Sequence, residues 1–364
     1  MSRHREPSSP HPGAVFEHTG RSEGTATDDR AASPLRLGLL GCSPIARRRM
    51  LPAIGLLDTV RLSGVAAREI ERAKDVAAEL GTVASGYDEI LGRDDVDAVY
   101  ISLPNGLHYE WAGNALRAGK HVLCEKPLAT TRENAVELTE LAASRGLVLR
   151  ENFSFEHHSQ HTKVRQLLAE GRFGIPRTFT GSFCIPPLPP DDTRYNAALG
   201  GGALLDIGVY PLRAAQLLLG PDLTVTGATL RVDERLAVDL AGQVQLVSAD
   251  GVFAQLEFGI QHSYGSRYSL WGSAASVSLD RAFTPPPSRQ PVLRITEQDH
   301  AEEIVLPPSD QFRNSVEAFV AATGPVVDAA AERPWLDRAV TTARLIDEIR
   351  KKAVRVGARD EGDG

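Results

Sequence analysis

A lysine and a tyrosine occupy positions from which they could catalyse the reduction of a ketone. Residues 121–123 form a short apolar run that predicts a strand, and this strand delivers Lys126 to its carboxyl end before Pro127 stops it. In an open parallel sheet, ligands bind at that end of the strands. Asp206 and Tyr210 are four residues apart in a helical pattern, so their side chains share one helix face. Together these residues indicate hydride transfer on a nucleotide-binding fold.

Ketone reduction needs a hydride and a proton donor within about 2.6 to 3.2 Å of the carbonyl oxygen, and Tyr210 can be that donor. A free phenol titrates near pH 10, which is high for an acid at neutral pH. A cation about 4 Å away contributes roughly 4 kcal/mol at an effective dielectric of about 20, so Lys126 could lower the pKa of Tyr210 by at most about three units. Lys126 could instead reach the nicotinamide ribose or the carbonyl. The structural alternatives are a packed aromatic for Tyr210 and a solvated charge for Lys126.

The elements that must position these residues alternate in the first half of the chain. Predicted strands are followed by predicted helices, which implies a doubly wound parallel sheet of the Rossmann type. The strands are 35–40, 61–67, 98–102 and 121–125, and the helices are 46–57, 70–80, 107–118 and 131–145.

The second half of the chain has a different order of predicted elements, in which one long helix precedes a series of strands with alternating apolar and polar residues. This pattern predicts an α+β domain with a large, open, mostly antiparallel sheet. The helix is 202–219, the strands are 223–233, 243–249, 252–260, 267–271 and 276–279, and the closing helices are 311–322 and 335–352. The predicted divisions are a disordered extension at 1–33, a dinucleotide-binding domain at 34–150, an open-sheet domain at 151–334, a helix at 335–352 and a tail at 353–364. Helices cover one face of such a sheet, so the other face could hold a homo-oligomer, a dimer or tetramer.

Composition limits the classes of partner. The chain has 364 residues and 42% hydrophobic content, enough for two cores. Its net charge of -7 argues against nucleic acid or an anionic membrane surface as partner. We find no apolar run near the roughly 18 residues that span a bilayer. Cys42, Cys124 and Cys184 have no disulfide or zinc spacing, which favours a reducing cytoplasm and no metal site. Residues 1–33 lack periodic apolar positions, as expected of disorder.

The first strand is followed by a weakened version of the dinucleotide fingerprint Gly-x-Gly-x-x-Gly. Gly41 is retained, while Ser43 and Ala46 take the places of the other two glycines. Serine still permits close approach of a pyrophosphate, and alanine still permits helix packing. An ordinary strand-to-helix turn is the alternative. The residues predicted to contact the cofactor here are Gly41, Cys42, Ser43, Ile45 and Ala46.

The choice of cofactor is determined at the end of the second strand, where a carboxylate would bind the ribose of NAD. Here the sequence reads Ala66-Ala67-Arg68, with no carboxylate. Arg68, with Arg47 or Arg48, could pair with a 2′-phosphate, which favours NADPH. The alternative is that these arginines are solvated charges at helix starts.

Several other polar residues are candidates with structural alternatives. Asn105 could position the nicotinamide or belong to an ordinary turn. Asp206 could orient a sugar or start its helix. Arg194 and Tyr195, on a loop rich in proline and aspartate, could bind a diphosphate and a base, or form a plain surface loop.

Three histidines, His157, His158 and His161, lie close together on a segment that enters a helix. A metal site was considered for them. Because carboxylates are scarce nearby and hydride transfer needs no metal, solvated or substrate-contacting histidines are the favoured interpretation.

The chain resembles the glucose-fructose oxidoreductase, inositol dehydrogenase and rhizopine-catabolism (Gfo/Idh/MocA) family. The resemblance lies in Leu103-Pro104-Asn105 with His108, in Glu125-Lys126-Pro127, and in the glycine run 200–202 followed by Asp206 and Tyr210. It implies a Rossmann domain joined to an open-sheet domain. The cofactor contacts that it implies are Leu103, Pro104, Asn105, His108, Glu125 and Lys126. The substrate contacts that it implies, together with the loop residues above, are Asn152, His158, Arg194, Tyr195, Asp206 and Tyr210.

Most of that family carries histidine where this chain has Tyr210. The tyrosine resembles two branches, the nucleotide-sugar 3-ketoreductases and the dihydrodiol and xylose dehydrogenases. Residues 151–161, 191–195, 270–273 and 280–286 look most like the 3-ketoreductases. That branch implies NADPH-dependent reduction of a dTDP-3,4-diketo-2,6-dideoxyhexose to its 4-keto product. The alternatives are NADP-linked oxidation of a free sugar or dihydrodiol, and a non-catalytic NADP-binding regulator.

Overall fold

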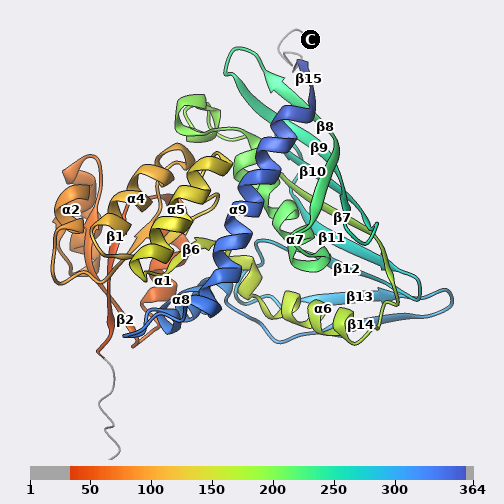
Figure 1. The fold of residues 1–364 in the computed structure, drawn as a ribbon, viewed down its shortest axis with the longest axis horizontal. Coiled ribbons are helices and arrows are strands. Elements are labelled where there is room, and N and C mark those ends of the chain that lie inside the picture. The colour runs from red at the N-terminus through yellow and green to blue at the C-terminus, as the bar shows by residue number, and fades with distance from the viewer. Residues whose placement is uncertain (1–32, 358–364) are drawn as a thin grey trace, which may run out of the picture. The chain divides into compact units, whose positions relative to one another are not determined.

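The computed structural model describes residues 33–357, and residues 1–32 and 358–364 lie outside the described part. The predicted disordered extension at 1–33, apart from its last residue, and the end of the predicted tail therefore lie outside the described residues. The described part contains two β-sheets with helices packed against them (Figure 1).

Within the described residues, the first sheet has six strands in the order β3-β2-β1-β4-β5-β6, and every neighbouring pair is parallel. The strands are β1 (Leu35–Leu40), β2 (Val60–Ala66), β3 (Ala84–Ser85), β4 (Ala98–Ile101), β5 (His121–Glu125) and β6 (Leu149–Asn152). The helices are α1 (Leu51–Ile54), α2 (Ile70–Leu80), α3 (Tyr87–Leu91), α4 (His108–Arg117) and α5 (Arg132–Arg145). The strand order reverses between β1 and β4, which creates a ligand-binding edge at their carboxyl ends. The predicted doubly wound sheet is confirmed.

The second sheet has nine strands within residues 33–357, in the order β14-β13-β12-β11-β7-β10-β9-β8-β15. All pairs are antiparallel except β7 with β10 and β8 with β15. The strands are β7 (Pro176–Ile185), β8 (Leu223–Asp233), β9 (Val238–Ser248), β10 (Phe253–Ile260), β11 (Gly265–Gly272), β12 (Ser276–Asp280), β13 (Val292–Thr296), β14 (Ala301–Val305) and β15 (Ala353–Gly357). The remaining helices are α6 (Ser159–Ala169), α7 (Val209–Leu219), α8 (Gln311–Ala322) and α9 (Ala329–Lys352).

Several elements differ from the predicted ones. The tail predicted from 353 begins as strand β15, which pairs with β8. The helix predicted from 335 begins at Ala329, because Asp328 caps it by accepting hydrogen bonds from the backbone of Ala330 and Ala331. Strand β6 runs to Asn152, two residues beyond the predicted division, so the boundary between 150 and 151 remains a prediction. Strands β3, β6, β7, β13 and β14 and helix α3 were not predicted.

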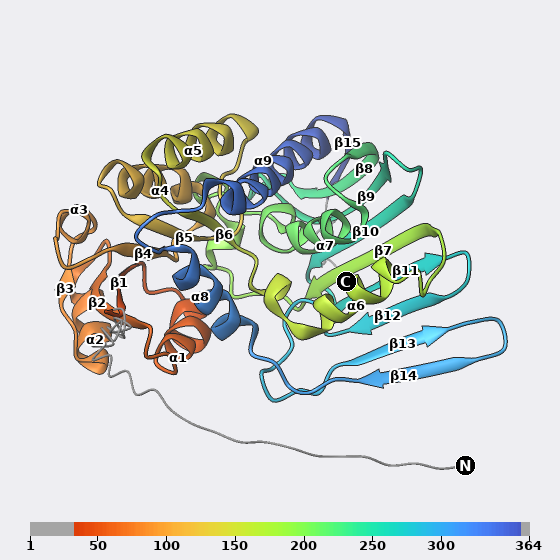
Figure 2. The ribbon, with the colours of Figure 1, turned by 60° about the horizontal axis from the view of Figure 1, so that its bottom comes forward.

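Helices cover one face of the nine-stranded sheet (Figure 2). Alternation along β9 shows the two faces, since Val244 and Leu246 are buried in the core while Gln243 and Gln245 are exposed. Helices α7 and α9 contact the buried face. The segment Ala197–Leu219 is long and apolar enough to cross a membrane, contrary to the sequence expectation, but 83% of its most apolar window is buried inside the protein. It therefore has the character of a core helix.

Buried ion pairs join the two sheets through β6. Arg150 of β6 donates to Glu332 of α9 at 2.7 Å, and both side chains are under 10% exposed. The neighbouring Glu151 accepts a hydrogen bond from Arg213 of α7, which is 2% exposed. Removing one partner of a buried pair leaves an uncompensated charge, so these pairs fix the relative positions of β6, α7 and α9. Helix α7 carries Tyr210, and β6 neighbours the strand that delivers Lys126.

Candidate active site

Lys126 follows β5 at the carboxyl edge of the parallel sheet and reaches the helix segment that carries Asp206. Its Nζ donates to the Asp206 carbonyl oxygen at 2.7 Å and to Asp206 Oδ1 at 3.0 Å. Lys126 is 8% exposed and Asp206 is 7% exposed. A lysine and an aspartate separated by 80 residues are thus joined in a buried pair.

Asp206 also binds a second cation. Its Oδ2 accepts from Arg194 Nε at 2.5 Å, and Arg194 Nη1 lies 3.2 Å from Asp192 Oδ1. Burial alone would raise the pKa of Asp206, but the charges and hydrogen bonds of Lys126 and Arg194 hold that pKa at about 2. Asp206 is therefore ionised, and Arg194 is occupied by two carboxylates. This geometry does not support the predicted role of Arg194 as a free cation for a diphosphate.

Tyr210 lies beside this pair with its ring in an aromatic cluster. The ring centroids of Phe153, Phe155, Phe183 and Phe283 lie 5.1 to 5.9 Å from that of Tyr210. The Lys126 Nζ lies over the ring face, 5.2 Å from the centroid. The structure therefore places Lys126, Asp206 and Tyr210 together, as the sequence predicts.

The electrostatic expectation for Tyr210 is wrong. Burial raises the pKa of Tyr210 well above its usual value, and the charges of Glu125 and Asp206 raise it further. Lys126 does not lower it, because the ammonium group lies over the ring and is bonded to Asp206. The phenol therefore keeps its proton at neutral pH. Within residues 33–357 the Tyr210 hydroxyl has no hydrogen-bond partner, so this proton is available to a bound molecule.

Local backbone geometry sets the register of this helix. Leu204–Gly208 form a π-helical turn, a conformation that is frequent at functional sites. The Leu204 N–H donates to Asp239 Oδ2 at 2.6 Å, so Asp239 of β9 caps the start of the segment. Gly202 precedes it with φ of 108°, and a side chain there would collide with Asp239. Asp239 was not singled out in the sequence, because its role depends on pairing between distant segments.

The turn after β1 fits close approach of a phosphate. Gly41 has φ of 93°, and a Cβ there would lie 2.5 Å from the Ser102 carbonyl oxygen. Ser43 Oγ accepts from the Ala46 N–H at 3.2 Å and also contacts the Ser102 hydroxyl. The predicted residues 41–46 thus lie against the end of β4, at the reversal of strand order.

The arginines near this turn differ in availability. Arg68 is 84% exposed, with only a 3.6 Å contact to Glu69. Arg47 is paired with Glu79 at 2.8 Å, whereas Arg48 has no ion pair within residues 33–357. Arg72, which sequence reasoning missed, accepts a weak contact from Cys42 Sγ on its carbonyl at 3.9 Å. Arg72 lies in the first turn of α2, close in sequence to Arg68. The candidates for binding a 2′-phosphate are therefore Arg68, Arg48 and Arg72.

Two predicted cofactor residues hold loops together. Asn105 Nδ2 donates to the Gly200 carbonyl at 2.9 Å, which ties the loop after β4 to the glycine run. The ring nitrogens of His108 lie 2.7 Å from the Pro127 carbonyl oxygen and 2.8 Å from that of Leu103. His108 is fully buried. It therefore joins the loops after β4 and β5, and its burial gives no support to the implied cofactor contact.

Glu125 and Asn152 form a buried polar group beneath Lys126. Glu125 accepts from the Tyr100 hydroxyl at 2.8 Å and from Asn152 Nδ2 at 2.7 Å, and burial raises its pKa. The Asn152 oxygen accepts from Ser154 and Ser315. Asn152 is 4% exposed with its amide satisfied, so its geometry supports a structural role and not the implied substrate contact.

The histidines also support the fold. His158 is fully buried and caps α6, its Nδ1 accepting from the Gln160 N–H at 3.2 Å. His161 Nε2 lies 2.8 Å from the Ala282 carbonyl oxygen, and His157 stacks on Trp335. No cluster of three metal-ligating side chains occurs in the described part of the chain. The implied substrate contact of His158 is not supported by its burial.

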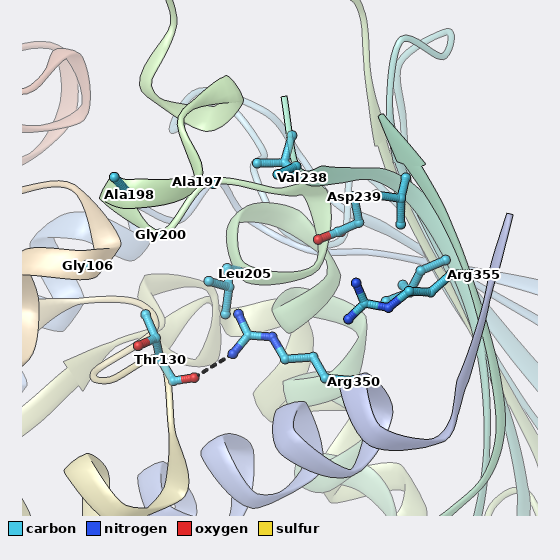
Figure 3. Close-up of a pocket in the computed structure, with 14 residues that line it drawn as sticks. Gly106, Thr130, Ala197, Ala198, Gly200, Leu205, Val238, Asp239, Arg350 and Arg355 are labelled. Atoms are coloured by element: carbon cyan, nitrogen blue, oxygen red, sulfur yellow. Dashed lines mark hydrogen bonds between the residues drawn. The ribbon is translucent and has the colours of Figure 1, made fainter. Parts of the chain in front are cut away.

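The loop before the glycine run borders two cavities. Tyr195, whose hydroxyl accepts from the Leu188 N–H at 3.2 Å, lines a cavity of ≈ 450 Å³ with Asp191 and Arg235. A second cavity, of ≈ 380 Å³, is lined by Gly200 and Gly201 of the glycine run (Figure 3). Arg350 and Arg355 point into it, and Arg350 donates to the Thr130 carbonyl at 2.7 Å. Neither Lys126 nor Tyr210 lines these cavities, so the cavities are separate from this candidate catalytic pair.

Comparison with known proteins places the chain in a family. Residues 35–153 match the profile of the Gfo/Idh/MocA oxidoreductase family with its NAD-binding Rossmann fold, and residues 161–278 match a C-terminal domain of the same family. The dTDP-3,4-didehydro-2,6-dideoxy-alpha-D-glucose 3-reductase of Actinomadura kijaniata is 48% identical over 90% of this chain and 97% of its own length. The reductase of the same name from Streptomyces violaceoruber is 48% identical over 88% and 95% of the two chains.

Solved structures agree with these relatives. KijD10, a 3-ketoreductase from Actinomadura kijaniata in complex with NADP and TDP-benzene, superimposes with a TM-score of 0.86 at 47% identity, over 90% of this chain and all of that one. Further KijD10 structures carry a substitution of one lysine or one tyrosine, and these two residues have the same spacing as Lys126 and Tyr210. An aldose-aldose oxidoreductase from Caulobacter crescentus has a TM-score of 0.77 at 26% identity, with coverage of 88% and 97%. This chain belongs to the Gfo/Idh/MocA oxidoreductase family.

Proposed function

We propose that this protein is an NADPH-dependent nucleotide-sugar 3-ketoreductase that converts a dTDP-3,4-diketo-2,6-dideoxyhexose to the 4-keto sugar. The observation that carries the proposal is the protonated Tyr210 beside Lys126, in a chain 48% identical to dTDP-sugar 3-reductases over nearly its whole length. A non-catalytic regulator would have no need of this pair.

Tyr210 is the proton donor in this proposal. When bound, NADPH supplies the hydride. The ketone oxygen gains negative charge as the hydride arrives, and the Tyr210 hydroxyl gives it a proton. A raised pKa suits this direction, since the group starts the reaction protonated.

Lys126 stabilises the charge that develops at the oxygen. Asp206 holds its ammonium group through two hydrogen bonds, and Arg194 fixes Asp206 in turn. The cation is thus oriented before the substrate binds, which is how enzymes stabilise developing charge at low reorganisation cost. Asp206 and Arg194 are positioning residues in this scheme.

The cofactor is held by the turn 41–46, by Leu103 and Pro104, and by Arg68 with Arg48 or Arg72. The fit rests on Gly41, where any side chain would collide with the Ser102 carbonyl, and on the absence of a carboxylate at 66–68. His108 and Asn105 hold the surrounding loops, and Glu125 joins the ends of β4, β5 and β6.

Arg68→Ala should raise the KM for NADPH about tenfold or more and leave the KM for NADH nearly unchanged. A charge-assisted contact to the 2′-phosphate contributes about 1.5 to 3 kcal/mol, and NADH lacks this phosphate. Steady-state kinetics with both cofactors measure this. Arg47→Ala is the matched control, because Arg47 is already paired with Glu79. Equal use of NADPH and NADH by the wild type would contradict the assignment.

A second function is conceivable from the same fold. An NADP-dependent D-xylose 1-dehydrogenase of Haloferax volcanii is 30% identical over 90% of this chain. Oxidation of a free sugar would not require a diphosphate on the substrate. Turnover of unsubstituted sugars at rates similar to those of nucleotide sugars would favour this alternative.

The open face of the nine-stranded sheet is the proposed contact with a second copy of the chain. Phe253 and Trp271, each 64% exposed, flank Thr178 in one row across three neighbouring strands. Large exposed aromatic side chains in a row are typical of an interaction surface. An isologous dimer would pair this row with itself.

The double substitution Phe253→Glu and Trp271→Glu should convert the oligomer to a monomer in sedimentation experiments. Like charges on a self-paired face repel across the two-fold axis, and the apolar contact is lost. Val326→Glu serves as control, since Val326 is 86% exposed and lies outside the sheet. A wild-type protein that sediments as a monomer at micromolar concentration would exclude this interface.

A reducing cytoplasm remains the proposed compartment. Cys42, Cys124 and Cys184 are all free and buried. Free buried thiols are the usual state of cysteines in reducing compartments.

The proposed function is tested with a substrate generated in place. Diketo sugars are unstable, so a sugar 2,3-dehydratase supplies the dTDP-diketohexose while this protein and NADPH are present. Consumption of NADPH that depends on the dehydratase supports the proposal. Loss of NADPH at the same rate without the dehydratase, or no loss with it, contradicts the proposal.

A further inference from the structure

The loop after β12 carries a residue in a strained conformation. Arg281 has φ of 54°, in the left-handed region that residues with a Cβ rarely adopt. Such strain persists only where the surrounding structure enforces it, and it is concentrated at binding and active sites. Arg281 is exposed and makes no ion pair within residues 33–357.

Buried side chains hold the segment that follows Arg281. The Ala282 carbonyl accepts from Gln160 Nε2 at 2.8 Å and lies 2.8 Å from His161 Nε2. The Phe283 N–H donates to Ser266 Oγ at 3.0 Å, and its carbonyl accepts from Gln311 Nε2 at 3.1 Å. These bonds come from α6, β11 and α8. His161 therefore helps to fix the loop that presents Arg281.

Arg281 is connected to the catalytic tyrosine through aromatic rings. Its guanidinium lies over the Tyr264 ring, 4.2 Å from the centroid, and the Tyr264 hydroxyl bonds Thr284 Oγ1 at 2.7 Å. Phe183 contacts both tyrosines, with its ring centroid 6.4 Å from Tyr264 and 5.1 Å from Tyr210. Arg281 therefore lies at the same end of the sheet as Tyr210, with two aromatic rings between them.

The proposed substrate would bring an anionic diphosphate into this region. The diphosphate is attached to C-1 of the sugar, and one ring carbon separates C-1 from the C-3 ketone. A ketone placed at Tyr210 therefore brings the diphosphate close to the same aromatic cluster. Lys126 and Arg194 are both paired with Asp206, whereas Arg281 makes no ion pair within residues 33–357.

We propose that the Arg281 guanidinium binds the diphosphate of the substrate and that the Tyr264 ring holds this guanidinium in place. The assignment rests on the proposed function. A planar guanidinium fits phosphate with two parallel hydrogen bonds, and stacking on a tyrosine leaves its donor edges free. Arg281 is a binding residue, and Tyr264 is a positioning residue that acts through it.

Calorimetric titration with thymidine diphosphate, in the presence of NADP, tests this proposal. Arg281→Gln should weaken binding about tenfold to a hundredfold, the range expected for charge-assisted contacts. Arg289→Gln is the matched control, an exposed arginine on the same loop that stacks on no aromatic ring within residues 33–357, and it should bind like the wild type. If both substitutions weaken binding of thymidine diphosphate equally, the effect comes from net charge and not from a specific contact, and the proposal is overturned.

Two further variants separate binding from stability. Arg281→Gly should have a melting temperature at or above that of the wild type, because glycine adopts positive φ without strain, while its affinity for thymidine diphosphate falls. Tyr264→Phe keeps the ring and should retain affinity, whereas Tyr264→Ala should lose it. Unchanged affinity in Arg281→Gly and Tyr264→Ala would overturn the assignment.

The outcomes distinguish this inference from the proposed function. Wild-type protein that does not bind thymidine diphosphate at all contradicts both. Binding that depends on Arg281, without reduction of the diketo sugar, supports the subsite and contradicts the reaction. Tight binding of thymidine diphosphate that is unchanged in Arg281→Gln is consistent with the proposed reaction but contradicts the assignment of Arg281 to the diphosphate.

Discussion

Tyr210→Phe should lower kcat by about 10² to 10⁴, the usual contribution of a positioned acid or base. The substitution removes one hydroxyl and keeps the ring that contacts four phenylalanines. Because that hydroxyl has no hydrogen-bond partner within residues 33–357, its loss leaves no protein group unpaired, and the melting temperature should hardly change. NADPH binding, measured by fluorescence, should persist.

The pH dependence gives a second readout of Tyr210. Its pKa is raised well above 10, so the phenol remains protonated between about pH 6 and 9 and its ionisation should not shape kcat in that range. A variant that retains most of its turnover when chemistry is rate-limiting would show that the proton comes from elsewhere, with water or a substrate hydroxyl as the next candidates.

Lys126→Ala should lower kcat at least as strongly as Tyr210→Phe, because it removes the charge beside the developing oxyanion and releases Asp206 from one of its two cations. If the lysine and tyrosine act as one unit, the double variant should be little worse than the poorer single variant. Losses that add fully in free energy would show that the two side chains act independently.

A structural effect of Lys126→Ala must be separated from the catalytic one. Removing one member of a buried ion pair typically costs about 3 to 5 kcal/mol, though Arg194 remains to compensate Asp206. Lys120→Ala is the matched control, since Lys120 donates to the Arg93 and Val96 carbonyls at 2.7 and 2.9 Å far from the site. It should lower the melting temperature and leave kcat unchanged.

The proximity of Lys126 and Tyr210 could be predicted from the sequence because its signals are local. A strand that ends at Lys126 and a four-residue spacing between Asp206 and Tyr210 depend only on neighbouring residues. Four strands of the parallel sheet could be predicted for the same reason, since β1, β2, β4 and β5 are largely apolar runs. The edge strands β3 and β6 lack such runs and were not predicted.

Other features depend on distant segments and could not be predicted. Strand β7 alternates Thr178 and Thr180 with Phe179 and Gly181, a weak pattern that becomes a central strand only through pairing with β10 and β11. The capture of Arg194 by Asp206 likewise requires the turn at 200–202. The sequence predicts Arg194 and Asp206 separately as substrate contacts. In the structure they form an ion pair, which reduces the positive charge that Arg194 can offer to a substrate.

The most direct test of the proposed reaction is the position of the transferred hydride. NADPH that carries deuterium at both C-4 positions of the nicotinamide is supplied with the dehydratase-generated dTDP-diketohexose, and the product is examined by NMR and mass spectrometry. We expect one deuterium at C-3 of a dTDP-4-keto-2,6-dideoxyhexose, and none when Tyr210→Phe replaces the wild type over the same time. Deuterium at C-4, or a product without deuterium, would contradict it.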